Sequence, residues 1–262
     1  MRFQFCRFLI YIVFIFQIFS CSKSDPATPP VTPPVTVVPG ATDTPVVKNC
    51  QIIAQYQTNG AGDTTAVITY TYLSDGRISG SLNKYTDING TYSVSFMYNG
   101  NMIYRAVAAG VNSSVDTITL NANGMISKDK EVVGASTWIS NWVYDANQQL
   151  TNFNQQQDAY PPYTATYVFT NGDNTLSTTA GFASDTLAYD LTKPAVHGNQ
   201  DEVNQLLSLG AMYIKNKHLV VSANHGSSIT YSYEYNSDGN ISKMKITAGS
   251  NVQYESFTYQ CK

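Results

Sequence analysis

A hairpin pattern that recurs along most of the chain constrains its fold more than any other feature. Each copy has a strand ending in an aromatic or apolar pair, a short turn rich in Asn, Asp and Gly, and a second strand that opens with Ile or Leu. The residues that precede the turns are Tyr72, Tyr98, Leu120, Tyr144, Phe169 and Tyr235. The first five follow one another at intervals of about 24 residues, which is the length of one two-stranded hairpin with its connections. The chain is therefore predicted to be a repetitive antiparallel β protein.

Alternation within these strands predicts a sheet with two different faces. Ile68, Tyr70 and Tyr72 fall on one side of their strand, because successive side chains of a strand point to opposite faces. Thr69 and Thr71 fall on the other side. One covered, aromatic face and one polar face are typical of an antiparallel meander. Roughly 14 twisted strands do not stay flat, so we expect an all-β, single antiparallel meander curled into an open or half barrel.

One segment departs from the repeat and has the signals of a helix. Asn199 is a suitable N-cap, Asp201 and Glu202 fall in the first turn, and Gly210 is a suitable stop. A short helix over about 199–209 is therefore predicted, and we expect it to cover the mouth or concave side of the curled sheet. Its apolar side would consist of Val203, Leu206, Leu207 and Leu209.

The first 20 residues predict an export signal. Two arginines precede an apolar run, Phe8 to Phe19, that is too short for a membrane-spanning helix of about 20 residues. The run Ile18-Phe19-Ser20-Cys21 resembles the bacterial lipobox. This resemblance implies that residues 1–20 are a lipoprotein signal peptide and that Cys21 carries acyl chains such as palmitate. An ordinary cleaved signal, with Cys21 incidental, is the alternative.

Residues 21–48 combine this cysteine with a Pro/Thr-rich linker, and residues 49–262 form the predicted β domain. Seven of the ten prolines lie between Pro26 and Pro45, so the linker favours an extended polyproline II conformation. Such a segment suits a tether that holds a domain away from a membrane. By resemblance to other lipoproteins, Ser22 directly after the lipid-bearing cysteine implies transport to the outer membrane. Exposure of the domain on the cell surface is a further expectation.

The repeat unit itself resembles the YD repeat of Rhs-type proteins. The lipobox, the low-complexity spacer and the curved all-β domain together resemble a family of Bacteroidota cell-envelope lipoproteins of unknown function. The segments "ITYSYEYNSDGNISKMKIT" and "YESFTYQCK" carry this resemblance, which covers most of residues 50–262. It implies an envelope lipoprotein and no established activity.

Composition and motifs argue against several functional classes. The net charge is −3 and only 15 Lys and Arg are dispersed along the chain, so no basic face for nucleic acid is expected. The three histidines do not form a metal motif, and no nucleophile elbow or phosphate-binding loop is present. We therefore expect no metal, no cofactor and no catalysis, and a binding or structural module in the envelope. The alternative is a hydrolase of glycans or peptides with an unrecognised site, which a cleft with convergent carboxylates or a histidine pair would favour.

Two cysteines frame the predicted domain. Cys50 and Cys261 lie at its two ends. Because an exported protein occupies a compartment where disulfides persist, we predict a disulfide that joins the first and last strands. Two separate thiols are the alternative.

Two further sets of residues are candidate sites. Trp138 and Trp142 lie on one face of one strand and are candidates for stacking against a sugar or an apolar ligand, if the aromatic face is not simply core. Three Asp-Thr-x triplets are similar to the Bacteroidota O-glycosylation acceptor, although a Thr-rich chain also produces such triplets by chance. Their threonines are Thr64, Thr117 and Thr186.

The expected partners are the membrane, which the lipid would contact, and a glycan or an envelope protein. The domain itself is expected to be monomeric.

Overall fold

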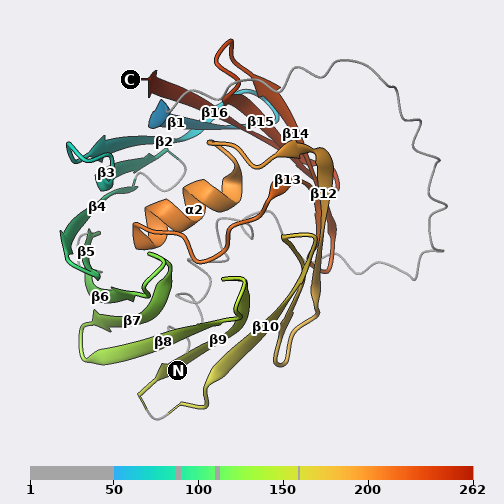
Figure 1. The fold of residues 1–262 in the computed structure, drawn as a ribbon. Helices are drawn as coiled ribbons and strands as arrows, with labels where there is room; N and C mark the ends of the chain where they lie inside the picture. The colour runs from blue at the N-terminus through green and yellow to red at the C-terminus, as the bar shows by residue number, and fades with distance from the viewer. Residues whose placement is uncertain (1–49, 87–89, 110–112, 159, 262) are drawn as a thin grey trace. The chain divides into compact units, whose positions relative to one another are not determined.

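The computed structural model describes residues 50–86, 90–109, 113–158 and 160–261, which form sixteen β-strands and one α-helix (Figure 1). The strands are β1 (Cys50–Asn59), β2 (Thr64–Tyr72), β3 (Ile78–Tyr85), β4 (Gly90–Asn99), β5 (Met102–Ala108), β6 (Ser114–Leu120), β7 (Ile126–Val133), β8 (Ser136–Tyr144), β9 (Leu150–Gln157), β10 (Tyr163–Thr170), β11 (Asp173–Thr179), β12 (Asp185–Pro194), β13 (His218–Asn224), β14 (Ser228–Tyr235), β15 (Ile241–Ala248) and β16 (Asn251–Cys261). The helix is α2 (Gln200–Leu209).

The sixteen strands form a closed antiparallel barrel. Each strand pairs with its neighbours in sequence, and β1 also pairs with β16, from Cys50 opposite Cys261 to Asn59 opposite Gln253. The expectation of an open or half barrel is therefore wrong, and the expectation of roughly 14 strands was too low. Alternation predicts that a sheet curves, but it carries no information on whether the two outermost strands meet. Closure pairs the backbone groups that both edges would otherwise expose.

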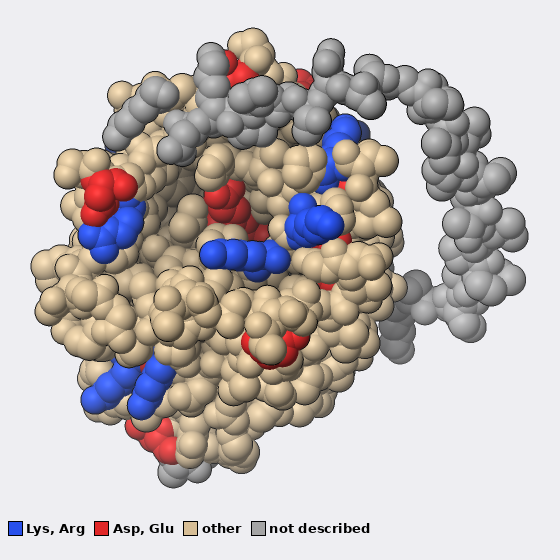
Figure 2. Space-filling view, viewed as in Figure 1, with Lys and Arg blue, Asp and Glu red and all other residues tan. Residues whose placement is uncertain are grey.

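The barrel interior is the apolar and aromatic face that alternation predicts. Ile68, Ile103 and Ile118 point inward and are fully buried, whereas Thr69 and Thr71 on β2 are exposed on the outside. Charged side chains are scattered over the face shown in Figure 2, most of which is uncharged. The outward positions of the described strands combine hydroxyl and amide side chains with exposed apolar ones, among them Met97, Val115, Val143 and Val168.

A shared hydrogen bond explains why tyrosine recurs before the turns. The hydroxyl of Tyr72 donates to the Ile52 carbonyl (2.7 Å), and that of Tyr144 donates to the Ile126 carbonyl (2.6 Å). The same bond recurs from Tyr98, which also precedes a turn, to Ile78. It is also made by two tyrosines that do not directly precede a turn, from Tyr233 to Val220 and from Tyr259 to Ile241. Ile52 and Ile126 lie beside register shifts of the ladder, where a bulge interrupts regular pairing. These repeat tyrosines are therefore structural ties between neighbouring hairpins.

The predicted helix is confirmed, and it lies inside the ring of strands (Figure 1). The side chain of Asn199 accepts a hydrogen bond from the Glu202 amide (2.9 Å), and Gly210 ends the helix with φ 69°. Only glycine fits at this end, because a Cβ on Gly210 would lie 2.7 Å from the ring of Phe96. The backbone oxygen of Gly210 also accepts a bond from the Tyr98 hydroxyl (3.3 Å).

The buried side of α2 differs in part from the expected one. Val203 and Leu209 are buried as predicted, whereas Leu206 and Leu207 are only half-buried. Gln205 takes an interior position instead. Its amide oxygen accepts bonds from the backbone amides of Tyr213 and Ile214, and its amide nitrogen donates to the Ile214 carbonyl. A polar residue is tolerated there because it satisfies the backbone of the segment that follows the helix.

Replacing Leu209 by Ala tests this packing. We expect a loss of about 2–5 kcal/mol in the free energy of unfolding, because truncating a buried leucine leaves a cavity. Thr71→Ala, on the outer face, is the control and should change stability by no more than about 0.5 kcal/mol. Urea unfolding followed by tryptophan fluorescence measures both variants. Equal stability of the two would contradict a helix packed in the interior.

No helix within the described ranges has the length and apolar character needed to cross a membrane.

Candidate functional site

Five aromatic rings form a continuous ladder from the interior to one end of the barrel. Tyr213, in the segment after α2, lies 6.2 Å from Trp142 on β8, measured between ring centroids. Trp142 lies 5.1 Å from Phe153 on β9, which lies 6.1 Å from Tyr163 on β10. Tyr163 lies 6.3 Å, edge to face, from Phe182 in the β11–β12 turn. Trp142 is 8% exposed and Phe182 is 67% exposed, so the ladder carries aromatic surface out to solvent.

The two tryptophans do point to the same side of β8, but they differ in accessibility. Trp142 is part of the core, packed against Phe153 and Tyr213. Trp138 is half-buried and lies opposite Glu131 on β7 and Gln157 on β9. A stacking role for Trp142 would need the core to open, whereas Trp138 keeps some accessible surface, and a stacking role for it stays a prediction.

Sequence reasoning missed Phe182, the most exposed ring of the ladder. Its only sequence signal is a bulky apolar residue inside a Gly-Ser turn, in Gly181-Phe182-Ala183-Ser184, where polar residues are usual. Polar groups lie beside this ring in the fold. The Tyr163 hydroxyl and the Thr179 hydroxyl are 3.2 Å apart.

An imidazole–carboxylate pair lies at the same end of the barrel. Nδ1 of His225, in the β13–β14 turn, bonds to Oδ1 of Asp185 at the start of β12. Both side chains are partly exposed. Burial raises the pKa of Asp185, and the neighbouring His225 opposes this shift. We call Tyr163, Thr179, Phe182, Asp185 and His225 the rim site.

A second cluster, of charged side chains, lies inside the barrel on β5, β6 and β7. Nε of Arg105 bonds to Oδ2 of Asp116, and its guanidinium lies 3.9 Å from Glu131. Asp129 belongs to the same interior face, and burial together with the charge of Asp116 raises its pKa to about 8. Burial also raises the pKa of Asp116, against the effect of Arg105. Oδ1 of Asp116 and Oδ1 of Asp129 accept no hydrogen bond from the described residues.

These carboxylates converge, which is the arrangement that would favour a hydrolase. However, Asp116 is 0% exposed and Asp129 is 6% exposed, so a substrate does not reach them. A general acid or base must lie within hydrogen-bond reach of the group it serves. The cluster is therefore interpreted as part of the barrel's interior structure.

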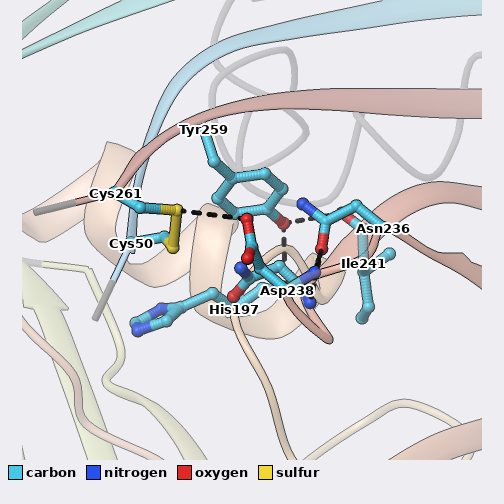
Figure 3. The surroundings of a disulfide bond; sticks show 8 residues. Cys50, His197, Asn236, Asp238, Ile241, Tyr259 and Cys261 are labelled. Carbon is cyan, nitrogen blue, oxygen red and sulfur yellow. Dashed lines mark hydrogen bonds between the residues drawn. A yellow bond between two sulfur atoms is a disulfide. The ribbon is translucent and has the colours of Figure 1, made fainter. Parts of the chain in front are cut away.

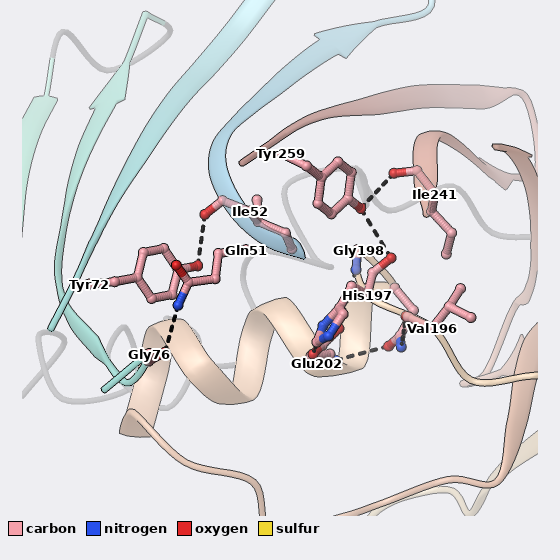
Figure 4. Close-up of polar contacts among 11 residues, drawn as sticks. Gln51, Ile52, Tyr72, Gly76, Val196, His197, Gly198, Glu202, Ile241 and Tyr259 are labelled. Atoms are coloured by element: carbon pink, nitrogen blue, oxygen red, sulfur yellow. Dashed lines mark hydrogen bonds and ion pairs between the residues drawn. The ribbon is translucent and has the colours of Figure 1, made fainter. Parts of the chain in front are cut away.

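The other polar groups of the interior hold the segment around α2. Nδ1 of His197 lies 2.6 Å from Oε1 of Glu202, and the Tyr259 hydroxyl reaches the His197 carbonyl (Figure 4). The bond to Glu202 raises the pKa of His197, and burial opposes this effect. His218 bonds to Asp173 through both its backbone amide and Nδ1. All three histidines of the chain thus have a carboxylate partner.

A small cavity lies beside the start of α2. Its volume is about 10 Å³, which is room for about one water molecule. Burial raises the pKa of Asp201, which faces this space and takes a hydrogen bond from Asn216. The lining residues are Asn199, Gln200, Asp201, Val220, Tyr231 and Tyr233. This cavity is too small for a sugar or a cofactor.

The predicted disulfide is confirmed. Cys50 and Cys261 are joined by an S–S bond of 1.96 Å, with their Cα atoms 4.0 Å apart and a sequence separation of 211 (Figure 3). The bond links β1 to β16 at the point where the barrel closes. Oδ2 of Asp238, in the β14–β15 turn, lies 3.7 Å from Sγ of Cys261.

The remaining predicted sites are untested. Thr64 and Thr186 are exposed on outward positions of β2 and β12, and Thr117 is half-buried on β6, so O-glycosylation of these threonines stays a prediction. Cys21, with the signal peptide and the linker, lies outside the described residues.

Comparison with known proteins supports the architecture alone. No family model matches the chain, and no curated protein matches it. A porin-like protein from Bacteroides uniformis ATCC 8492 superposes with a TM-score of 0.59 at 12% identity, covering 80% of this chain and 96% of the other. A porin-like protein from Bacteroides vulgatus ATCC 8482 gives 0.52 at 14% identity, covering 80% and 98%. The chain is thus similar in fold to porin-like barrels of Bacteroides, while neither the YD-repeat nor the lipoprotein resemblance gains support from these matches.

Proposed function

We propose that this chain is a lipid-anchored, non-catalytic protein of the bacterial outer membrane whose barrel stands in water and binds a glycan. The lipobox ending at Cys21 and the Pro-rich segment after it support the anchor. The likeness to porin-like barrels of Bacteroides supports the envelope location. The observation that carries the proposal is the orientation of the barrel's two faces.

A barrel that spans a membrane needs an outward apolar band about 25 Å tall and a polar lumen. The outward positions of the described strands instead mix polar with apolar side chains. Their inward side holds the aliphatic and aromatic core. On β10, the outward positions Thr164, Thr166 and Thr170 are exposed together with the apolar Val168, and on β14 the exposed outward positions include Ser232 and Glu234. Each hydroxyl or carboxylate placed in hydrocarbon without a partner costs several kcal/mol, so the polar outward positions favour water over lipid.

The rim site supports a glycan as ligand. The exposed ring of Phe182 offers a flat apolar surface to the C–H face of a sugar. Thr179, Asp185 and His225 add hydrogen-bonding groups at the same end, which would fix the orientation of sugar hydroxyls. An envelope protein is the other partner that the sequence suggests, and the binding experiment separates the two.

The anchor is tested by replacing Cys21 with Ala. We expect the protein to move almost completely from the membrane fraction to the soluble fraction, because two or more acyl chains hold a protein firmly and a polar barrel adds little. Cell fractionation and palmitate labelling measure this change, with Cys6→Ala, in the signal peptide, as the control. If the Cys21→Ala protein stays in the membrane and requires detergent, the barrel itself is inserted and the proposal is wrong.

The ligand is tested with a glycan array and Phe182→Ala. We expect about a 2- to 13-fold loss of affinity for the bound glycan, since an aromatic contact contributes about 0.5–1.5 kcal/mol. Met97→Ala is the matched control, because Met97 is 69% exposed on β4 and lies outside the rim site. Equal loss in both variants, or an array on which no glycan binds, would contradict a glycan function.

A further inference from the structure

One part of the barrel's outer wall, formed by β6, β7 and β8, combines lysines with exposed aliphatic side chains. The three strands are consecutive neighbours on one side of the ring (Figure 1). Two exposed lysines lie on outward positions of β7, and four exposed aliphatic residues lie on outward positions of the three strands. The outward positions between them hold threonine and asparagine. We call these six residues the lysine face: Val115, Lys128, Lys130, Val132, Ile139 and Val143.

The strand register joins the members of the lysine face into one patch. Val115 lies directly opposite Val132, and Lys130 lies directly opposite Ile139. The Cβ atoms of such cross-strand partners are about 4.5–5.5 Å apart. Lys128, Lys130 and Val132 also alternate along one side of β7. A contiguous group of exposed apolar side chains marks an interaction surface, whereas isolated ones need no explanation.

No acidic side chain offsets the positive charge of this face. Strands β2 to β10 contain three acidic residues, Asp116, Asp129 and Glu131, and all three point into the barrel, where Arg105 is close to them. On the outward positions of these nine described strands, the charged residues are Lys84, Lys128 and Lys130. The wall is therefore cationic on this side and complements an anionic surface.

We propose that the lysine face rests on an anionic phospholipid surface, with the barrel itself outside the hydrocarbon. The ammonium groups of Lys128 and Lys130 pair with lipid phosphates, and the aliphatic side chains enter the boundary between headgroups and acyl chains. Lysine suits this position, because its methylene stem covers apolar surface while its ammonium group stays in the polar layer. The inference rests on the proposed lipid anchor only in that the anchor brings the barrel to a bilayer.

Other occupants fit the lysine face less well. Two copies of this chain related by a two-fold axis would place the same patch against itself, so Lys128 and Lys130 would face like charges, which is unfavourable. A nucleic acid offers phosphates but no apolar layer for Val115 and Ile139. A phospholipid surface supplies both. Two lysines give only a weak contact, so this face orients the barrel and the acyl chains hold it.

The test uses the Cys21→Ala protein, so that no acyl chain contributes to binding. The protein is mixed with vesicles of equimolar phosphatidylglycerol and phosphatidylcholine, or of phosphatidylcholine alone, and the bound fraction is measured by sedimentation. We expect binding to the anionic vesicles at low salt. Binding should be at least about tenfold weaker to the neutral vesicles. It should weaken equally at about 1 M salt, where the Debye length is only about 3 Å.

Reversing both lysine charges, Lys128→Glu with Lys130→Glu, should weaken binding at least about tenfold. The matched control is Lys243→Glu with Lys245→Glu, which changes the net charge by the same amount at the same spacing on β15. Glu234 lies directly opposite Lys243, so that side of the wall is not uniformly cationic, and the control should bind as the reference does. Circular dichroism checks that every variant keeps its strands.

The apolar part of the contact is tested by Ile139→Ser, which should lower binding severalfold. Val168→Ser, at an exposed position of β10 outside the lysine face, should leave it unchanged. Equal binding of the two double lysine variants, equal binding to neutral vesicles, or no binding to anionic vesicles would overturn the proposal. So would a dimer in size-exclusion chromatography that Lys128→Glu with Lys130→Glu abolishes, because a second copy would then occupy the face. None of these results bears on the anchor, which cell fractionation tests separately.

Discussion

Replacing both Cys50 and Cys261 by Ser is expected to lower the free energy of unfolding by about 5 kcal/mol. The cross-link spans 211 positions, so it restrains nearly the whole β domain in its unfolded ensemble. In the chain-entropy model a loop of this length lies near the top of the range for a single disulfide, because the entropy removed grows with the logarithm of loop length. The value is an upper figure, since residual structure in the unfolded chain reduces it.

Urea unfolding of the double variant, in the presence of a metal chelator, measures this loss. The wild-type chain with its disulfide intact is the reference, and the wild-type chain reduced with a dithiol should match the double variant. A loss below about 1 kcal/mol would mean that the hydrogen bonds between β1 and β16 alone hold the barrel closed.

Replacing Arg105 by Ala is expected to cost about 3–5 kcal/mol. The guanidinium is the cationic partner of Asp116 and lies 3.9 Å from Glu131 inside the barrel. Its removal leaves buried carboxylates without a counter-charge, which is far more costly than the loss of an exposed pair. Arg77→Ala is the matched control, because Arg77 and Asp75 form a solvent-exposed pair whose loss should change stability far less.

The loss should also depend on pH in a defined direction. The folded chain keeps Asp129 protonated up to about pH 8, while an unfolded aspartate releases its proton near pH 4. The folded state therefore binds more protons over this range, and stability falls as pH rises through it. Without Arg105, which lowers the pKa of Asp129 and Asp116, the fall should be steeper. Chemical unfolding at pH 5 and pH 8 measures this difference, and a larger loss at pH 5 would contradict the interpretation.

Local features of this protein could be read from the sequence. The alternation of Ile68 and Tyr70 with Thr69 and Thr71 correctly separated the interior from the outer face. The caps of α2 at Asn199 and Gly210 were also correct. Each of these features depends on residues within a few positions of one another, through the period of a strand, the φ angle of a turn or the capping of a helix end.

Non-local features could not be read in the same way. Whether β1 meets β16, whether Phe182 extends a ladder that begins at Tyr213, and whether Arg105 neutralises Asp116 all depend on the registers of several strands at once. The disulfide is the exception, because Cys50 and Cys261 were the two cysteines left in the exported domain. The interior position of Gln205 in place of Leu206 could not be predicted for the same reason. It depends on the backbone groups of Tyr213 and Ile214 that the tertiary fold brings within reach. Sequence periodicity thus determined the two faces of the sheet and the kind of each element, and only the tertiary structure decided closure and the contacts between distant elements, because these depend on strand register summed around the whole barrel.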